Sequence, residues 1–289
     1  MLMRHLSVVL GSTLLAITLS SYAGHHDMQV DKNALKQVVE SRSADDKARD
    51  KFRHPAETLA FFKVTPGMTV AEALPGGGWY SKIIVNYLGE SGTIYGVNYA
   101  DDMWARFGFF TEEGIKERIA STNAFPTKVA ELTNNGISAR GFTFADVPDE
   151  LAGTADRVLF IRALHNLSRF ESEAGKLTEA LASTHKLLKK GGMVGVVQHR
   201  IPESATEESA SGDRGYLKQS FVIDVFEKAG FTLVNSSEIN ANPKDQPADT
   251  DLVWRLPPTY FQTREDTEKK AAVDAIGESD RMTLLFKKK

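Results

Sequence analysis

The stretch Val70–Gly78, VAEALPGGG, carries the strongest structural signal in this sequence. Its apolar first half is typical of a strand that ends near Glu72, and three glycines then precede a helix that begins at Trp79. Glycines let the backbone approach a ligand closely, and a helix N-terminus offers free N–H donors. The pattern predicts a ligand-binding turn between a strand and a helix. The alternative is a tight connection that needs positive φ angles and binds no ligand.

Strands and helices alternate around this turn. Apolar runs bounded by breaker residues predict strands at 68–74, 92–97, 137–144, 155–161, 193–198, 231–236 and 282–286. Helical patterns lie before and between them, at 32–50, 55–62, 79–88, 121–134, 171–188 and 216–229. Because alternating strands and helices build a parallel sheet with helices on both faces, we expect an α/β fold.

The composition is that of an ordinary globular protein, with 42% hydrophobic and 25% charged residues among 289. A formal net charge of -3 gives no basic footprint, so nucleic acid is not an expected partner. The same charge does not favour acidic substrates or anionic membrane surfaces. The sequence contains no cysteine, which excludes disulfides, thiolate nucleophiles and cysteine-ligated metals. This composition fits an oxidising compartment.

The first 23 residues have the pattern of a signal peptide. Arg4 precedes the apolar run Leu6–Leu19, and Ser21-Tyr22-Ala23 places small residues where a signal peptidase cuts. The apolar run is short for a membrane span. We expect cleavage after Ala23, a periplasmic or secreted protein, and no membrane association afterwards. The alternative is an uncleaved anchor.

Three parts are predicted along the chain: the signal peptide at 1–23, a leader with a helix at 24–54, and one domain at 55–289. Two insertions interrupt that domain, at about 98–120 and 240–280. A long segment of the second kind inside a compact domain is usually a lid or a binding loop.

Both insertions hold candidate site residues. Trp104, Phe107 and Phe110 recur at three-residue spacing, which is more often typical of a core stripe than of a substrate cage. Together with Val253–Pro258 they are also candidates to close over a pocket. Within that second stretch, Arg255 is a candidate to bind an anionic substrate, with a helix end or a carboxylate as the alternative partner.

A dinucleotide-binding turn is the main alternative for the glycine-rich stretch. Gly76, Gly78 and Ser81 nearly satisfy the spacing G-x-G-x-x-G that such a turn needs. However, Glu72 precedes the loop, where a dinucleotide fold needs no acid. A second five-stranded half is also missing.

The chain resembles class I S-adenosylmethionine-dependent methyltransferases, and more narrowly an exported bacterial group of predicted methyltransferases with the turn P-G-G-G-[WY]-Y. The similarity runs from Arg49 to the C-terminus and is carried by the segments 59–62, 66–67, 75–80, 164–166, 229–231 and 280–287. It implies a Rossmann-like, mostly parallel seven-stranded sheet with helices on both faces. In that fold the last two strands form an antiparallel hairpin at the edge of the sheet.

The same resemblance implies S-adenosylmethionine as the cofactor. Glu72 then meets the amino acid end of the cofactor, partly through its ammonium group. The glycines Gly76, Gly77 and Gly78 form the turn beside which the cofactor passes.

The resemblance also assigns the nucleoside end, with departures from the family pattern. The residue that ends the second strand usually binds the ribose hydroxyls and is usually acidic, but here it is Asn98, whose amide lacks the two-pronged grip of a carboxylate. Asp146, after the third strand, falls where the family contacts the adenine amino group. Leu74 replaces the first glycine of the general pattern.

Two histidines follow strands whose carboxyl ends face the ligand edge of a parallel sheet. His165 follows the fourth strand and His199 the fifth, and we predict both as catalytic residues because a neutral imidazole can remove a proton from a nucleophile. Their neighbours Asn166 and Arg200 are predicted to contact the substrate. The alternative is that each histidine only holds a loop by a hydrogen bond.

Tyr80 is predicted to contact the substrate, because it follows the glycines directly. The face of Tyr80 or of Trp79 is a candidate to stabilise the sulfonium charge, and core packing is the alternative. No residues are predicted as ligands of a structural or catalytic metal. Cleavage after Ala23 would expose Gly24-His25-His26, whose nitrogens form a set that suits square-planar Cu(II) or Ni(II).

The sequence predicts an S-adenosylmethionine-dependent methyltransferase that acts on an unidentified small substrate. The predicted export argues against it, because the cofactor is made in the cytoplasm. The second interpretation is a binding protein that keeps the fold and has lost or changed the reaction. A nicotinamide enzyme is the third. The sequence gives no oligomeric state.

Overall fold

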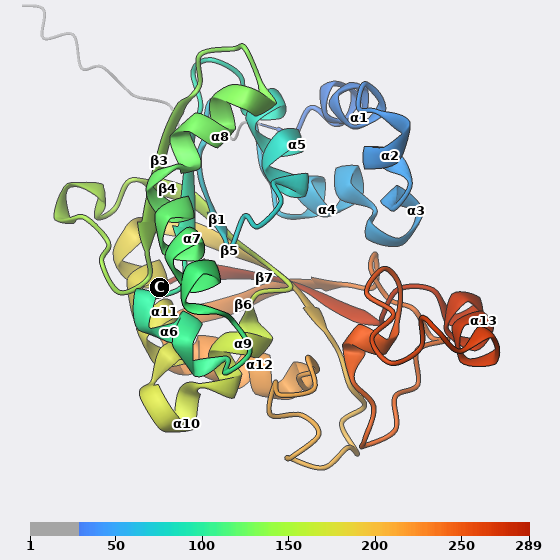
Figure 1. Ribbon diagram of the computed structural model, residues 1–289. Helices are drawn as coiled ribbons and strands as arrows, with labels where there is room; N and C mark the ends of the chain where they lie inside the picture. Colours follow the sequence, from blue (N-terminus) through green and yellow to red (C-terminus); the bar gives the residue numbers. More distant parts are fainter. Residues whose placement is uncertain (1–28) are drawn as a thin grey trace, which may run out of the picture.

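The computed structural model describes residues 29–289 (Figure 1). The predicted signal peptide at 1–23 and the stretch Gly24-His25-His26 lie outside the described residues. Within the described part of the chain, no helix combines the length and the apolar character that a membrane span requires.

The core is one seven-stranded sheet in the order β3-β2-β1-β4-β5-β7-β6. The strands are β1 (Thr69–Ala73), β2 (Thr93–Asn98), β3 (Ser138–Thr143), β4 (Ala155–Ile161), β5 (Leu188–His199), β6 (Phe231–Ser237) and β7 (Arg281–Lys288). The first five strands are parallel, and β7 runs antiparallel to both β5 and β6. The predicted Rossmann-like α/β fold, with an antiparallel pair at the C-terminal edge, is therefore confirmed.

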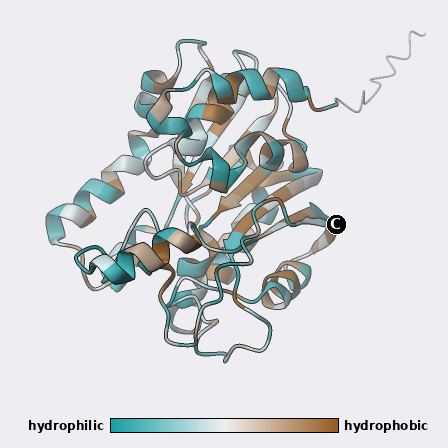
Figure 2. Ribbon diagram, turned by 90° about the vertical axis from the view of Figure 1, so that its right-hand side faces the viewer, coloured by the Kyte–Doolittle hydropathy of each residue, from teal (hydrophilic) through white to brown (hydrophobic). Residues whose placement is uncertain are grey.

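Helices cover both faces of the sheet (Figures 1 and 2). One face carries α1 (Lys32–Glu40), α4 (Pro55–Phe61), α5 (Trp79–Leu88) and α8 (Phe125–Leu132), and the other carries α6 (Asp101–Arg106), α9 (Leu164–Arg169), α11 (Lys176–Leu187) and α12 (Gln219–Lys228). The remaining helical segments are α2 (Ala44–Lys47), α3 (Asp50–Arg53), α7 (Glu112–Asn123), α10 (Glu171–Ala174), α13 (Thr267–Ile276) and the 3-10 turns η1 (Asp149–Leu151) and η2 (Val253–Arg255).

Side chains of the central strands alternate between the two layers. On β4, Val158 and Phe160 pack into one hydrophobic cluster, while Leu159 packs into the other. This is the period of two that a strand imposes on its side chains. Since both layers are apolar, the central strands read as unbroken apolar runs in the sequence. Figure 2 shows the same arrangement, with hydrophobic strands inside and hydrophilic helix faces outside.

The structure differs from the predicted elements in several places. The helix predicted at 32–50 is broken into α1, α2 and the start of α3, and the helices α6 and α9 were not predicted. The helix predicted at 121–134 is two helices, α7 and α8, because the chain breaks at Ala124 and restarts with Pro126 in the first turn of α8. The helix predicted at 171–188 is interrupted by Gly175, which has a φ of 61°. A further helix, α13, lies in the insertion at 240–280, where only a loop was expected.

The junction between α7 and α8 packs directly on the sheet beside the ligand edge. Glycines on β2 and β3 make this possible, because a Cβ on Gly96 would lie 2.6 Å from the Phe125 ring and one on Gly141 would lie 1.8 Å from the Thr122 carbonyl oxygen. This close approach fixes α7 over the end of β2.

We expect Gly141→Ala to lower the free energy of unfolding by about 1–3 kcal/mol, because the new methyl group overlaps a backbone carbonyl that cannot move alone. Urea denaturation followed by circular dichroism measures the change. Gly77→Ala is the matched control, because nothing lies within 4 Å of its Cβ position. Equal stability of the two variants would contradict the packing described here.

Candidate functional site

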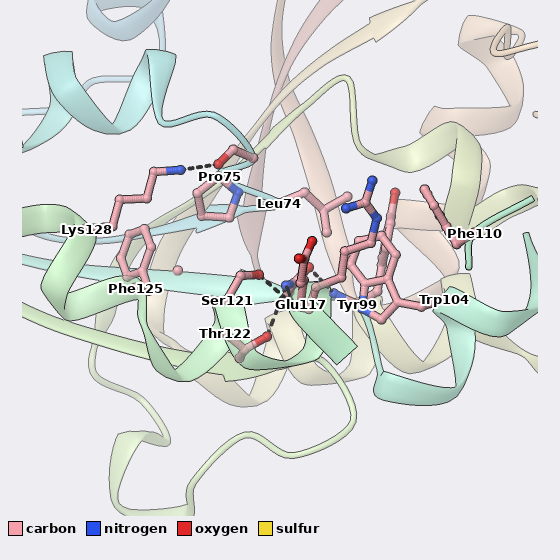
Figure 3. Close-up of a pocket in the computed structure, with 14 residues that line it drawn as sticks. Leu74, Pro75, Tyr99, Trp104, Phe110, Glu117, Ser121, Thr122, Phe125 and Lys128 are labelled. Atoms are coloured by element: carbon pink, nitrogen blue, oxygen red, sulfur yellow. Dashed lines mark hydrogen bonds between the residues drawn. The ribbon is translucent and has the colours of Figure 1, made fainter. Parts of the chain in front are cut away.

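Two cavities lie at the edge of the sheet where β1, β2, β4 and β5 end, as parallel sheets place their ligands. The first, which we call the β1–β2 cavity, has a volume of about 440 Å³ (Figure 3). It is lined by Leu74, Pro75, Gly76, Gly96, Asn98, Tyr99, Trp104, Phe110, Glu117, Arg118, Ser121, Thr122, Phe125 and Lys128.

The second, which we call the β4–β5 cavity, has a volume of about 300 Å³. It is lined by Arg49, Leu74, Ile161, Arg162, His165, His199, Val253, Trp254, Leu256, Pro257, Pro258, Thr259, Glu278 and Ser279. Leu74 lines both cavities and so lies between them.

The turn after β1 has the backbone of a glycine turn although it begins with leucine. Leu74 has a φ of 54°, Gly76 of 52° and Gly78 of 82°, and Gly78 caps the start of α5. The N–H of Leu74 donates to the carbonyl of Val97 on β2 at 2.8 Å. A left-handed backbone is unfavourable for a leucine, and such conformations cluster at functional sites. The position where the resemblance expects a glycine therefore keeps the glycine conformation.

Glu72 lies buried on β1, directly before this turn. The hydroxyl of Ser81 on α5 donates to its carboxylate at 2.6 Å. Burial raises the pKa of Glu72 to about 7, although the Ser81 hydrogen bond and the positive charge of Lys128 both lower it. The carboxyl group is thus at the predicted place, close to the glycines, while it lines neither cavity.

Lys128 is a site residue that the sequence did not reveal. Its Nζ, from α8, donates to the carbonyl oxygen of Gly76, and its Cε lies 3.1 Å from where a Cβ of Gly78 would be. In Figure 3 it reaches over the turn from the side of the cavity that also holds Phe125. In the sequence, a lysine in a helix indicates only a solvated face.

Asn98 ends β2 and lines the β1–β2 cavity, but its amide is already engaged. Its Oδ1 accepts from the N–H of Tyr99 at 2.9 Å, and its Nδ2 donates to Thr122 Oγ1 at 3.0 Å. Asp146 lies exposed in the turn after β3 and lines neither cavity. The predicted contacts of these two residues with the ribose and the adenine stay predictions.

Aromatic rings form one wall of the β1–β2 cavity. Figure 3 shows Tyr99, Trp104 and Phe110 together on one side of it. The guanidinium of Arg118 lies 4.0 Å from the centroid of the Phe110 ring, and the buried Nε1 of Trp104 has no hydrogen-bond partner within residues 29–289. Phe107 of the same stripe is buried in the core. The stripe is therefore partly core and partly cavity wall.

The two predicted catalytic histidines meet in the β4–β5 cavity. Their ring centroids are 5.6 Å apart, and both side chains are buried. His165 Nδ1 lies 3.4 Å from Gln198 Oε1, and His199 Nδ1 lies 2.5 Å from Ser279 Oγ. Burial, with the nearby positive charge of Arg162, lowers the pKa of His165 to about 4. Burial and the charges around it also lower the pKa of His199, so both rings are neutral at pH 7.

Of the predicted substrate residues, Asn166 and Tyr80 line neither cavity. The side chain of Asn166 lies beside the Tyr99 hydroxyl, whose pKa is raised by burial. Tyr80 is buried, and its hydroxyl donates to the Arg53 carbonyl at 3.3 Å. The neighbouring Trp79 ring packs against the guanidinium of Arg53 at 4.6 Å, so protein cations already occupy its surroundings.

The two arginines predicted to meet the substrate are paired within the protein. Arg200 binds Asp280 at 2.8 Å and Glu238 at 2.7 Å. Arg255 binds the buried Asp245 at 3.0 Å. Neither lines the β4–β5 cavity, although Arg200 lines a separate cavity of about 280 Å³. The predicted substrate contacts of both arginines stay predictions.

Another arginine lines the β4–β5 cavity. Arg162 directly follows β4, has a φ of 61° and faces the same space as the two histidines. Further lining residues come from the insertion at 240–280, which contributes Val253, Trp254 and the stretch from Leu256 to Thr259. In the sequence, Arg162 is a single charge after an apolar run, with nothing to show that it faces a cavity.

No family model matches the sequence, and no curated protein matches it. Solved structures do resemble its fold. A geranyl diphosphate C-methyltransferase from Streptomyces coelicolor A3(2) has 11% identity and a TM-score of 0.51, with 90% of this chain and 87% of that one covered. The [4+2]-cyclase SpnF has 13% identity and a TM-score of 0.49, with 86% and 83% covered. An S-adenosylmethionine-dependent methyltransferase from Aquifex aeolicus has 17% identity and a TM-score of 0.46, with 73% and 93% covered.

At these identities the likeness concerns the fold alone, and among these three only the geranyl diphosphate C-methyltransferase has a TM-score above 0.5. Its agreement extends over most of both chains. Combined with the strand order and the antiparallel β7, it shows that this chain has the fold of class I methyltransferases.

Proposed function

We propose that this protein binds S-adenosylmethionine and transfers its methyl group to a small substrate. The observation that carries the proposal is the left-handed turn Leu74–Gly78, set between a cavity with aromatic walls and a cavity with two neutral histidines. A nucleoside and a methyl acceptor need two such adjoining spaces at the ligand edge of the sheet.

The β1–β2 cavity fits the nucleoside part of this cofactor. Its volume of about 440 Å³ is in the range of small-molecule sites, and its rings suit a planar base. The buried Trp104 Nε1 lacks a partner within residues 29–289, so a hydrogen-bond donor is available there. Asn98 fits less well than an acidic residue, since both ends of its amide already bond within the protein.

The glycine turn fits the amino acid part, which carries an ammonium and a carboxylate. Glu72 lies directly before the turn and Lys128 reaches over it, so one acidic and one basic side chain flank the same backbone. A pair of opposite charges complements a zwitterion. When bound, S-adenosylmethionine supplies a methyl group attached to a positively charged sulfur.

The side chains of the β4–β5 cavity suit the binding and deprotonation of a methyl acceptor. His165 and His199 are neutral, so either ring can accept a proton from a hydroxyl or amine nucleophile. Gln198 and Ser279 each hold one ring nitrogen and so orient the imidazoles. Residues of the 240–280 insertion also line this cavity.

The structural neighbours give the proposal further support. The geranyl diphosphate C-methyltransferase was solved in complex with Mg2+, geranyl diphosphate and S-adenosyl-L-homocysteine.

The signal-peptide pattern at 1–23 leads us to propose a periplasmic or secreted location.

A binding protein that keeps the fold without methyl transfer is the second candidate. The engaged amide of Asn98 and the leucine side chain between the two cavities favour it. Since a fold hosts many activities, these site residues decide between the candidates and the fold does not.

We expect Gly76→Val to abolish the binding of S-adenosylhomocysteine, measured by calorimetry. The added side chain fills space beside the turn, where only the Leu74 carbonyl lies within 4 Å. Gly136→Val is the control, because it places the same side chain on an equally left-handed backbone, with a φ of 75°, away from both cavities. Undiminished affinity in Gly76→Val, or no binding by the unmodified protein, would contradict the proposed cofactor site.

We expect Lys128→Met to weaken the binding of S-adenosylhomocysteine by about tenfold. The binding of adenosine should stay nearly unchanged, because adenosine lacks the amino acid carboxylate. The exposed Lys116 on α7 offers the control Lys116→Met. Equal losses for the two ligands in Lys128→Met would show that Lys128 does not contact the amino acid part.

We expect the affinity for S-adenosylhomocysteine to rise with pH between about pH 5.5 and pH 8. Since the pKa of Glu72 is raised to about 7, its carboxyl is protonated below that pH and must lose the proton to pair with the ligand ammonium. Below the pKa, the affinity falls by up to about tenfold per pH unit. Glu72→Gln should bind more weakly and lose this pH dependence, and an unchanged pH profile in that variant would overturn the assignment.

A further inference from the structure

Four arginines gather at one side of the β4–β5 cavity around a single carboxylate. Glu278 is bound by Arg49 at 2.6 Å, by Arg281 at 3.2 Å and by Arg53 at 3.4 Å. Arg162 lies close enough for its charge to act on the same groups, but its guanidinium forms no ion pair within residues 29–289. Four guanidinium groups against one carboxylate leave an excess of three positive charges.

Hydrogen-bonding capacity in this cluster is also unused. Within the described part of the chain, the buried Nη2 of Arg49 and the buried Nε of Arg281 have no partner. Burial, together with repulsion from Arg53 and Arg281, lowers the pKa of Arg162 to about 9. Buried charges without partners are costly, so such an excess is expected where a ligand brings the missing negative charge.

The other charged groups nearby do not neutralise the cluster. Asp280 is paired with Arg200, and Asp50 is paired with Arg42. Burial raises the pKa of Tyr80, so its hydroxyl stays uncharged. The two histidines are neutral and add no charge of either sign.

The shape of the cavity adds a second requirement. Leu74, Trp254 and Leu256 give it apolar walls, while Arg49 and Arg162, with Glu278 beside them, give it a charged side on which the cations outnumber the one acid. Its volume of about 300 Å³ admits a small molecule only. The ligand that fits is therefore small, with an apolar body and an oxyanion.

We propose that the β4–β5 cavity binds the carboxylate or phosphate group of the methyl acceptor, with Arg162 as its principal partner and Arg49 as the second. A guanidinium presents a planar pair of donors that matches two oxygens of either group. This arrangement holds the acceptor beside the two histidines. That the bound molecule is the methyl acceptor rests on the proposed function. That it is an anion rests on the residues of the cavity alone.

Calorimetry at constant ionic strength tests the anion site with four probes: inorganic phosphate, phenylphosphate, phenylacetate and its neutral match phenylacetamide. We expect the unmodified protein to bind phenylphosphate or phenylacetate at least about tenfold more tightly than phenylacetamide. Tighter binding of phenylacetate indicates a carboxylate substrate, and tighter binding of the two phosphates indicates a phosphate substrate. No preference for any anion over phenylacetamide would overturn the proposal.

The variant Arg162→Gln tests whether Arg162 binds the anion. We expect it to bind the preferred anion about tenfold or more weakly, while its affinity for S-adenosylhomocysteine stays within about twofold. Arg140→Gln is the matched control, since Arg140 is an exposed arginine paired with Glu150 on the far edge of the sheet. Unchanged anion affinity in Arg162→Gln would refute its role.

The melting temperature of Arg162→Gln shows whether a loss of anion binding results from misfolding of the variant. Without added anion, we expect Arg162→Gln to melt at or above the temperature of the unmodified protein, because the substitution removes a charge that Arg53 and Arg281 repel. If it melts well below, Arg49→Gln takes its place in the anion titrations, and unchanged anion affinity there overturns the proposal. Anion binding without S-adenosylhomocysteine binding would refute the proposed function and keep this site. The reverse result would refute only the anion site.

Discussion

The N–H of Leu74 donates to the carbonyl of Val97, and this hydrogen bond ties the turn after β1 to the neighbouring strand. The bond holds the leucine in a left-handed backbone that its side chain disfavours. From there the chain passes through Gly76 and Gly78 into α5. Because the same leucine lines both cavities, the position of this turn sets the separation between the β1–β2 cavity and the β4–β5 cavity.

The glycine turn and the β4–β5 cavity also differ in the charges that surround them. The glycine turn is flanked by one acid and one base, which together suit a ligand end with both charges. The β4–β5 cavity has an excess of buried positive charge and neutral histidines. The low pKa of the histidines follows partly from the same arginines. One cluster can thus bind an anion and keep the neighbouring imidazoles able to accept a proton.

Much of the fold could be predicted from the sequence because it depends on local patterns. The strand at 155–161 and the helix at 79–88 were predicted with the bounds that the structure has, from unbroken apolar runs and their breakers. The meeting of His165 and His199 followed from their positions after neighbouring parallel strands. The helix break at Ala124 was missed although Pro126 is a sequence signal for a new helix start, whereas the close approach of Phe125 to Gly96 depends on the fold.

The site residues that were missed depend on contacts between distant segments. Arg200 and Arg255 were predicted as substrate ligands, and the structure adds that Asp280 and Asp245 form ion pairs with them. Conversely, Arg162 became a candidate anion-binding residue because it lines the β4–β5 cavity and no carboxylate forms an ion pair with it within residues 29–289. A sequence shows which residues carry charge, whereas only the fold shows which charges are already paired.

The ion pair between Arg49 and Glu278 joins residues 229 positions apart, and it brings the segment of α2 and α3 against the residues before β7 (Figure 1). Contacts of such separation in sequence carry a large entropy of loop closure, which local contacts avoid. Residues from both ends of the described chain thus line the β4–β5 cavity, while the glycine turn is built from one short stretch. The cavity depends on long-range contacts that the turn does not need, so ligand binding in this cavity would report that the whole domain has assembled.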